Sequence, residues 1–251
     1  MNIGRVFINL KTFNMLSVVV PCYNEEENIP LIISNFEEII LAFEGEIEVI
    51  LVNNGSTDNS KNVFDEKIRD STQKIKVLNI KKNIGYGHGI LSGLKTAKGD
   101  VLAWTHADLQ TDPKDIISAL NEYKKYNNPF LIIKGQRKNR NLIDAFFTWG
   151  MQVYSNLILN TRLNDINAQP KLFSNTFFKT HMLNAPLDFS LDLFLLYMGN
   201  FHGEIKTIDV FFHERKFGKA KGGGSLKGKL KLIKRTLAFI SILKKNISLY
   251  K

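Results

Sequence analysis

Short apolar runs alternate with amphipathic segments along the first half of the chain. Residues 16–20 and 47–52 are nearly continuous β-branched and aliphatic runs, as expected of parallel strands covered on both faces. Between them, apolar residues recur with helical spacing from Ile29 to Phe43. Asn28 and Pro30 precede and open this segment, and both favour a helix start. The pattern predicts strand, helix, strand.

The alternation continues downstream. Further strands are predicted at residues 75–80, 99–103, 130–133 and 205–212. Four strand–helix alternations in about a hundred residues predict a doubly wound α/β sheet with right-handed crossovers. The glycine-rich turn at residues 83–89 could cradle a phosphate, but close packing of a helix on the sheet is the favoured interpretation.

Composition places few further limits on the fold. At 251 residues, with 44% hydrophobic and 23% charged residues, the chain can bury one large globular core. The single cysteine, Cys22, excludes an internal disulfide and fits a reducing compartment. No run reaches the roughly 18 apolar residues of a membrane span, and no signal peptide is visible.

Charge is concentrated at one end of the sequence. Residues 215–251 contain 12 Lys or Arg and no Asp or Glu, whereas the rest has 22 basic and 24 acidic residues. A near-neutral body with a basic tail indicates a local surface for phosphates or anionic lipid. Nucleic acid is not an expected partner, because the tail lacks interleaved aromatic residues for base stacking.

Polar chemistry is densest directly after the strand at residues 99–103. His106, Asp108 and Gln110 occupy alternate positions there, so their side chains can point the same way. Ligands of open α/β sheets bind at the carboxyl ends of the strands. The stretch is therefore either a metal and nucleotide-sugar site or a polar turn before the next helix.

Four motifs in order carry a resemblance to a known family. They are residues 17–26 (SVVVPCYNEE), residues 54–58 (NGSTD), residues 83–85 (NIG) with Gly99-Asp100, and residues 107–110 (ADLQ). Together they resemble family-two inverting glycosyltransferases, within the branch of dolichyl- and polyprenyl-phosphate sugar synthases. The resemblance runs from about residue 16 to residue 221. It implies a glycosyltransferase A-type, nucleotide-sugar-binding fold with a mixed, mostly parallel sheet flanked by helices.

The resemblance implies a donor site built on the first two strands. Residues in the family's nucleotide-sugar positions are Pro21, Tyr23, Glu25, Asn54, Asp58, His106 and Asp108. The family's acidic pair after the second strand is replaced by Asn53 and Asn54. An amide can still donate and accept hydrogen bonds, so a GDP- or UDP-linked sugar remains the expected donor. Asp58 has helix capping as an alternative role.

The resemblance also implies a divalent cation. Asp108 and Gln110 match the family's metal motif, and His106 stands where a first Asp is expected. Such a cation neutralises the charge that develops on a leaving nucleoside diphosphate. Magnesium prefers oxygen ligands, whereas imidazole suits manganese, so manganese or magnesium is expected. The alternative for His106 is a cap on the turn that follows it.

Acceptor-side residues come from the second half of the chain. Arg137 and Lys171 take the family's positions for contact with an acceptor phosphate, although Arg137 could simply belong to a solvated basic cluster. Asp192 is the candidate base that a sugar hydroxyl acceptor would need, with a first-turn helix residue as its alternative. Arg215 and Lys221 match two family cations that would stabilise the diphosphate leaving group.

The domain division follows from these motifs. We expect an N-terminal extension at residues 1–14, a catalytic domain at 15–224 and a basic amphipathic helix at 225–251. One face of that helix has Leu226, Leu230, Ile233, Leu237 and Ile240, which suits an anionic membrane surface. Packing onto the domain or onto a partner subunit is the alternative.

The sequence thus predicts a metal-assisted, inverting glycosyltransferase. It would move a sugar from a nucleotide donor to a polyprenyl phosphate or lipid-linked glycan. The expected place is the cytoplasmic, inner face of the cell membrane, with peripheral attachment. Two alternatives stay open: transfer to a soluble or surface saccharide, and a catalytically silent nucleotide-sugar-binding protein.

Overall fold

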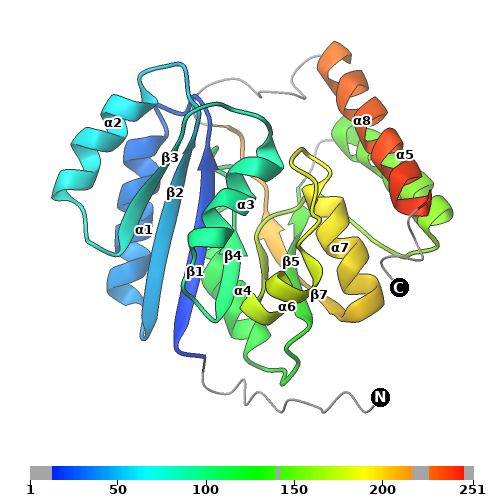
Figure 1. Cartoon of the computed structure of the whole chain (residues 1–251), viewed down its shortest axis with the longest axis horizontal. Coiled ribbons are helices and arrows are strands. Elements are labelled where there is room, and N and C mark those ends of the chain that lie inside the picture. Colours follow the sequence, from blue (N-terminus) through cyan, green and yellow to red (C-terminus); the bar gives the residue numbers. More distant parts are fainter. Residues whose placement is uncertain (1–12, 140–141, 216, 218–225, 246–251) are drawn as a thin grey trace.

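The computed structural model describes residues 13–139, 142–215, 217 and 226–245 (Figure 1). Within them, seven strands form one sheet in the order β3-β2-β1-β4-β6-β5-β7. The strands are β1 (Met15–Cys22), β2 (Glu46–Asn54), β3 (Ile75–Ile80), β4 (Val101–Trp104), β5 (Leu131–Lys138), β6 (Lys171–Ser174) and β7 (Glu204–Phe211). The helices are α1 (Ile29–Ala42), α2 (Ser60–Lys67), the 3-10 turn η1 (Ile68–Asp70), α3 (Tyr86–Thr96), α4 (Asp115–Tyr123), α5 (Leu142–Leu159), α6 (Asn175–His181), α7 (Leu191–His202) and α8 (Leu226–Lys245).

Strand pairing confirms a mixed, mostly parallel sheet. β1 pairs in parallel with β2 and β4, β2 with β3, and β5 with β7. Only β6 runs the other way, antiparallel to both β4 and β5. The sequence pattern did not predict β6, because four residues are too few to establish a period and the first of them is a lysine.

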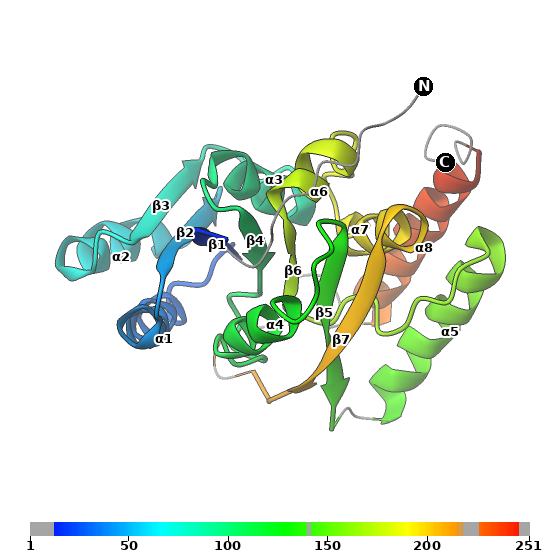
Figure 2. The same ribbon diagram turned by 90° about the horizontal axis from the view of Figure 1, so that it is seen from below.

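Helices cover both faces of the sheet, which explains the nearly continuous apolar strands. Figure 2 shows α1 and α4 on one side and α3, α6 and α7 on the other. Residues of β4 alternate between two cores: Val101 and Ala103 join the α1/α4 core, while Leu102 and Trp104 join the α3/α7 core. The predicted apolar face of α1 is confirmed, since every residue of that face from Ile29 to Ile40 is buried.

The glycine-rich turn before α3 serves close packing. A Cβ on Gly89 would lie 2.7 Å from Nδ2 of Asn54, so the start of α3 lies directly against the end of β2. Gly85 has φ 153°, and a Cβ there would lie 2.1 Å from the carbonyl oxygen of Leu187. Both positions therefore require glycine, one for space and one for backbone conformation as well. Of the two roles predicted for this turn, the structure favours packing.

The C-terminal helix packs onto the domain over its second half. α8 lies beside α5 at one end of the molecule (Figure 1), and the rings of Phe239 and Phe194 on α7 meet edge to face. Ile240 and Leu243 are fully buried in the α3/α7 core. The alternative of packing onto the domain is thus confirmed for these residues. Among the helices described, none is long and apolar enough to cross a membrane.

One buried carboxylate ties together the amino-terminal ends of the central strands. Glu48 on β2 is 2% exposed and accepts hydrogen bonds from Ser17 Oγ (2.7 Å), Lys76 Nζ (2.8 Å) and Lys98 N (2.7 Å). Burial alone would raise the pKa of Glu48, but these hydrogen bonds outweigh it and lower the pKa below 4.5. Ionised Glu48 therefore stabilises the fold.

We expect Glu48→Gln to lower the free energy of unfolding by about 2 kcal/mol at pH 7, because the buried partners lose a charged acceptor. A folded-state pKa below the unfolded value gives stability that is present above about pH 4.5 and is lost as the pH falls through the folded pKa. The difference between the two proteins should shrink below that pH. Urea unfolding at several pH values measures it, and a difference that stays constant down to pH 3 would contradict this account.

Candidate active site

The parallel strands deliver their carboxyl ends to one edge of the sheet, where the predicted motifs meet. β1, β2 and β4 are neighbours and run in the same direction. The loops after them hold residues 23–28, 55–59 and 105–114. Ligands of open α/β sheets bind at this edge. The topology therefore gathers the first, second and fourth motifs into one place.

The loops after β1 and β2 are hydrogen-bonded to each other. Asn24, with φ 54°, donates its backbone N–H to Ser56 Oγ at 3.0 Å, and Thr57 N donates to Asn24 Oδ1 at 2.8 Å. Asp58 accepts from the backbone N–H groups of Ser60 and Glu26. Asp58 thus joins the two loops beside the start of α2, which agrees with its alternative capping role.

Three predicted donor residues lie in or beside these loops. Pro21 lies near the end of β1, opposite Val52 of β2. Tyr23 is half-buried in the loop that follows, and Glu25 is buried. The structure places all three at the same edge as Asp108.

The two asparagines that replace the family's acidic pair have structural partners. Asn53 Nδ2 donates to Asn79 Oδ1 at 2.9 Å, and Asn53 Oδ1 accepts from Ser56 N at 3.2 Å. Asn54 Nδ2 donates to the carbonyl of Gly85 at 3.0 Å. Asn54 Oδ1 is buried without a hydrogen-bond partner.

Arg215 bridges two carboxylates at the centre of the site. Its Nη2 donates to Asp108 Oδ2 at 2.7 Å, and its Nη1 lies 3.6 Å from Glu25 Oε1. Glu25 is held by Asn28 Nδ2 at 2.6 Å. These side chains are at most 18% exposed, so the ion pairs are poorly screened by water. Arg215, the predicted cation for the leaving group, is therefore in direct contact with Asp108, the predicted metal ligand.

Gln110 fastens the segment after β7 to the same place. Gln110 Nε2 donates to the carbonyl of His213 at 3.2 Å, and His213 N donates to the carbonyl of Gln110 at 2.8 Å. This pair of bonds holds the backbone two residues before Arg215. Leu109, between Asp108 and Gln110, has φ 55°, so the backbone turns sharply there.

His106 is paired with Tyr86. The Tyr86 hydroxyl and His106 Nε2 are 3.0 Å apart, and Tyr86 also stacks on Phe189 with ring centroids 4.9 Å apart. Burial lowers the pKa of His106 despite the nearby carboxylates of Asp108 and Asp192. Burial, and then the Asp192 carboxylate, raise the pKa of the Tyr86 hydroxyl. The pair is therefore neutral, and the Nε2 atom of His106 is occupied by Tyr86.

Asp192, in the first turn of α7, is buried and hydrogen-bonded to side chains of the protein. Its Oδ1 accepts from Lys171 Nζ at 2.9 Å and from Gln169 Nε2 at 2.9 Å. Gln169 Nε2 lies 3.4 Å from the Tyr86 hydroxyl, so a polar chain runs from His106 to Asp192. Asp192 is 3% exposed. The carboxylate is positioned by its neighbours and is not presented to solvent.

Lys171 and Arg137 were predicted to contact an acceptor phosphate. All the hydrogen-bond donors of the Lys171 ammonium are used within the protein. Lys171 is 0% exposed, and Nζ donates to Asp192 and to the carbonyls of Ile166 (2.9 Å) and Ala168 (2.6 Å). An ammonium has three N–H donors, so none remains for an acceptor phosphate. The predicted contact of Lys171 with phosphate is incompatible with this arrangement.

Arg137 is also paired within the protein. Asp165 accepts two-pronged hydrogen bonds from its Nε and Nη2 and a further bond from its backbone N–H at 2.8 Å. The guanidinium also lies over the ring of Phe212 at 5.3 Å. With side-chain exposures of 12% and 11% for Arg137 and Asp165, this is a structural ion pair rather than a solvated cluster. Contact with a phosphate would need the guanidinium to share its remaining N–H donors.

The site offers a divalent cation few protein ligands. The described residues contain no group of three His, Cys, Asp or Glu side chains that could hold a metal. Asp108 supplies one carboxylate and Gln110 an amide oxygen, while His106 Nε2 is engaged by Tyr86. Cations that work on nucleotides are often held by one or two carboxylates together with phosphate oxygens. The residues fit a cation in that shared form only.

Part of the predicted site cannot be compared with the structure, and the structure adds residues that the sequence did not predict. Lys221 and residues 222–224 lie outside the described residues. The polar partners Tyr86, Gln169 and Asp165 were not predicted as site residues. Their sequence signal is weak, because each sits in a segment that was interpreted for another residue and their contacts span 20 or more positions.

Comparison with known proteins agrees with this geometry. A family model described as glycosyl transferase family 2 matches residues 17–187. Dodecaprenyl-phosphate galacturonate synthase of Rhizobium johnstonii is 28% identical over 169 residues, covering 65% of this chain and 49% of that protein. Undecaprenyl-phosphate 4-deoxy-4-formamido-L-arabinose transferase of Pectobacterium carotovorum is 29% identical over 208 residues, covering 82% of this chain and 62% of that protein. The chain therefore spans about half to three-fifths of the length of these relatives.

Solved structures show the same fold at low identity. The crystal structure of glucosyl-3-phosphoglycerate synthase from Mycobacterium tuberculosis with Mn2+, uridine diphosphate and glucosyl-3-phosphoglycerate has a TM-score of 0.68 and 15% identity, over 92% of this chain and 80% of that chain. The complex of that enzyme with uridine diphosphate has a TM-score of 0.71 and 16% identity, over the same shares. The predicted glycosyltransferase A-type fold is thus confirmed. Because the family model spans more than half of the sequence and its motifs meet at one edge of the sheet, the chain belongs to glycosyl transferase family 2.

Proposed function

We propose that the protein transfers a sugar from a nucleotide sugar to a polyprenyl phosphate, with inversion at the anomeric carbon. The observation that carries this proposal is the meeting of Asp108 with Arg215, 107 positions later, at the ligand-binding edge of the sheet. It is supported by the relatives of the chain, which are polyprenyl-phosphate sugar transferases.

The donor would lie across the loops after β1, β2 and β4. Its base and ribose would contact Pro21, Tyr23, Glu25 and Asn54, with Asp58 holding the loops and His106 lying near the sugar end. Either a UDP- or a GDP-linked sugar fits this proposal. Structural neighbours were solved with uridine diphosphate, which makes UDP-linked sugars the first donors to test.

A divalent cation, manganese or magnesium, would be held by Asp108 and the Gln110 amide oxygen together with the donor phosphates. When bound, it would neutralise charge on the diphosphate. Arg215 would turn from Asp108 to the diphosphate as the donor enters, since a guanidinium suits either oxyanion. Lys221 is proposed as a second cation for the leaving group.

The transfer step itself needs little proton chemistry. An oxygen of the acceptor phosphate would attack the anomeric carbon while the bond from that carbon to the nucleoside diphosphate breaks. A phosphate is already anionic, so no base has to remove a proton. This suits Asp192, whose Oδ1 is occupied by Lys171 and Gln169. We therefore assign Asp192 a positioning role, and we favour a phosphate over a sugar hydroxyl as the attacking group.

Attachment to the inner face of a membrane would use the basic side of α8. Ile240 and Leu243 face the domain, whereas Lys234, Arg235, Lys244 and Lys245 are exposed. Clusters of Lys and Arg bind anionic lipid surfaces at about 1 kcal/mol per residue near the surface. This arrangement favours electrostatic, peripheral binding over insertion of the apolar face.

The first prediction concerns Asp108. We expect Asp108→Asn to lower transfer from a UDP- or GDP-sugar panel to undecaprenyl phosphate by at least about a hundredfold, because a preorganised charge partner of the diphosphate is lost. The same variant should lose the Mn2+ binding that appears, by titration calorimetry, only when uridine diphosphate is present. Asp112→Asn is the matched control, since its carboxylate accepts only from the exposed Lys114 N–H.

Near-normal transfer by Asp108→Asn would overturn the site. Donor binding without transfer by the wild-type protein, to any acceptor and with either metal, would instead indicate the silent binding protein.

A second prediction separates a base from a positioning residue. A catalytic base contributes about 10²- to 10⁴-fold to rate, so a positioning role predicts that Asp192→Asn lowers kcat by less than about tenfold with undecaprenyl phosphate. Because the variant leaves Lys171 buried without its carboxylate, Asp192→Asn/Lys171→Met should be measured beside it, with thermal unfolding as the check on folding. A thousandfold loss of kcat in both well-folded variants would show that Asp192 is a base.

A third prediction tests the basic side of α8. Replacing Lys234, Arg235, Lys244 and Lys245 by Gln should at least halve the fraction of protein that sediments with vesicles of phosphatidylglycerol, and 0.5 M salt should do the same to the wild type. Lys61→Gln/Lys67→Gln on α2 is the control. Unchanged sedimentation of the fourfold variant would exclude this surface.

A further inference from the structure

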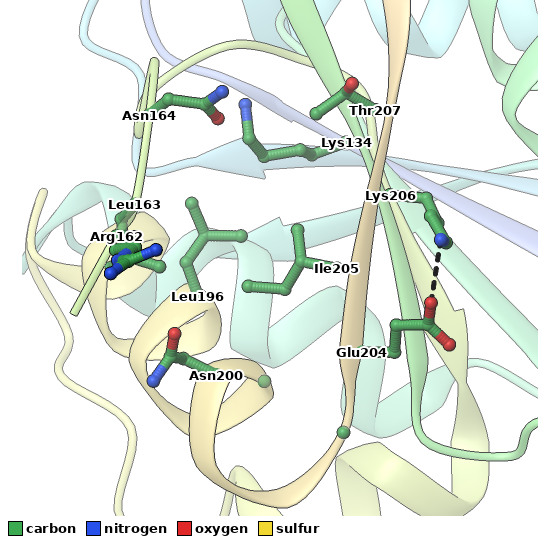
Figure 3. A pocket seen from close by; sticks show the side chains of 12 residues that line it. Lys134, Arg162, Leu163, Asn164, Leu196, Asn200, Glu204, Ile205, Lys206 and Thr207 are labelled. Carbon is green, nitrogen blue, oxygen red and sulfur yellow. Dashed lines mark ion pairs between the residues drawn. The ribbon is translucent and has the colours of Figure 1, made fainter.

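A polar pocket of about 530 Å3 lies on the α7 side of the sheet, away from the candidate active site. It lies between α7, the first half of β7 and residues 162–164 (Figure 3). Asp108 and Arg215 meet beyond the carboxyl ends of β4 and β7, whereas the pocket ends at Thr207. Four residues of strand, about 13 Å, separate Thr207 from the end of β7 at Phe211.

Hydrogen-bond donors outnumber acceptors in this pocket. Lys134, Arg162, Asn164, Asn200 and Thr207 contribute polar groups to the lining. The one carboxylate of the lining, Glu204, pairs with Lys206 at 2.8 Å. Figure 3 shows this pair on the opposite side of β7 from Leu196 and Ile205, turned away from the interior. The side of the pocket toward Leu196 and Ile205 therefore has two cationic side chains, Lys134 and Arg162, and no carboxylate.

Lys134 is the unusual member of the lining. It follows the buried aliphatic residues 131–133 on β5, is 1% exposed, and lies directly opposite Lys171 of β6. Its Nζ donates to the carbonyls of Gly135 (2.9 Å) and Asp165 (3.3 Å). None of the ion pairs between described residues includes Lys134. One of its three N–H donors is left over.

The charges around Lys134 do not balance. Arg137 pairs with Asp165 and Lys171 pairs with Asp192, so two carboxylates already serve two cations. Lys134 is a third buried cation in the same cluster. A buried charge is costly unless a counter-ion accompanies it. The cluster is one negative charge short on the side that opens into the pocket.

We infer that this pocket, the Lys134 pocket, binds a small phosphate monoester carried on a polyol, with the phosphate between Lys134 and Arg162. Three acceptor oxygens of a phosphate match an ammonium and a guanidinium. Asn164, Asn200 and Thr207 suit the hydroxyl groups of the polyol, and Leu196 and Ile205 suit its carbon face. The volume is within the usual range for small-molecule sites and exceeds what a bare phosphate needs.

The protonation of Lys134 agrees with this assignment. Burial, together with the charge of Lys171, lowers the pKa of Lys134 to about 7, against the opposing effect of Asp165. The charged groups facing it are Lys171 on β6, Arg137 on β5, Asp165 in the loop before β6 and Asp192 on α7. A bound anion would restore the proton. The inference rests on the pocket alone and would stand if the proposed transferase activity failed.

The test is calorimetric titration of the full chain with glycerol 3-phosphate. We expect saturable binding to one site, weakened about tenfold or more by Lys134→Met and by Arg162→Gln, since each removes a charged hydrogen bond. Arg162 is exposed, so its variant keeps the test valid if Lys134→Met unfolds. Lys206→Gln is the matched control, with the same loss of charge outside the interior, and should change the affinity by less than twofold. Arg215→Gln should likewise leave it unchanged.

A second arm identifies the source of the phosphate. Vesicles of phosphatidic acid present the same group on a lipid. Binding to the vesicles alone, with the same dependence on Lys134 and Arg162, would assign the pocket to a lipid headgroup, and binding of glycerol 3-phosphate would assign it to a soluble ligand. Absence of both, or binding that Lys134→Met and Arg162→Gln leave intact, would overturn the inference. Loss of binding in Arg215→Gln would move the phosphate to the candidate active site and overturn it equally.

Discussion

The buried charges beneath the acceptor side constrain much of the second half of the molecule. Five charged groups are packed between β5, β6, α7 and the loop before β6: Lys134, Arg137, Asp165, Lys171 and Asp192. Each must find a counter-charge or hydrogen bonds inside the protein, because water cannot solvate it. Asp165, with φ 35°, holds Arg137, and Lys171 fastens the carbonyls of residues 166 and 168. The path of the chain before β6 follows from these pairings.

The same cluster connects to the donor side through neutral polar groups. Gln169 donates to Asp192 and approaches Tyr86, whose hydroxyl meets His106. Because these three side chains are neutral, they connect the Asp192 cluster to the donor side without adding a buried charge. His106 therefore has Tyr86 as its hydrogen-bond partner, whereas the partner of the Asp108 carboxylate is Arg215. An arginine remains positively charged whether it pairs with a carboxylate or with a diphosphate.

Hydrogen bonds explain the two asparagines that replace the family's acidic pair after β2. Asn53 joins β2 to β3 and to the loop after β2, and Asn54 fastens β2 to the turn at Gly85. Carboxylates at these positions would face carbonyl and amide oxygens and could not donate to them. The amides therefore maintain this edge of the sheet, and Asn54 Oδ1 is buried there without a hydrogen-bond partner.

Much of the architecture was determined by local pattern in the sequence. The apolar runs of β1, β2 and β3 and the helical period of α1 need only neighbouring residues to be recognised, and the motif order led to the family and the correct edge of the sheet. Tertiary structure alone decided the pairing of charges. The ion pairs of Lys171 with Asp192 and of Asp108 with Arg215 join residues that are 21 and 107 positions apart. That Lys134 has no carboxylate partner among the described residues depends on how the other charges near it are paired. The spacing of residues in the sequence shows which side chains can lie on the same face of one element. Which charges form ion pairs depends on the distances between elements, and these are fixed only in the folded chain.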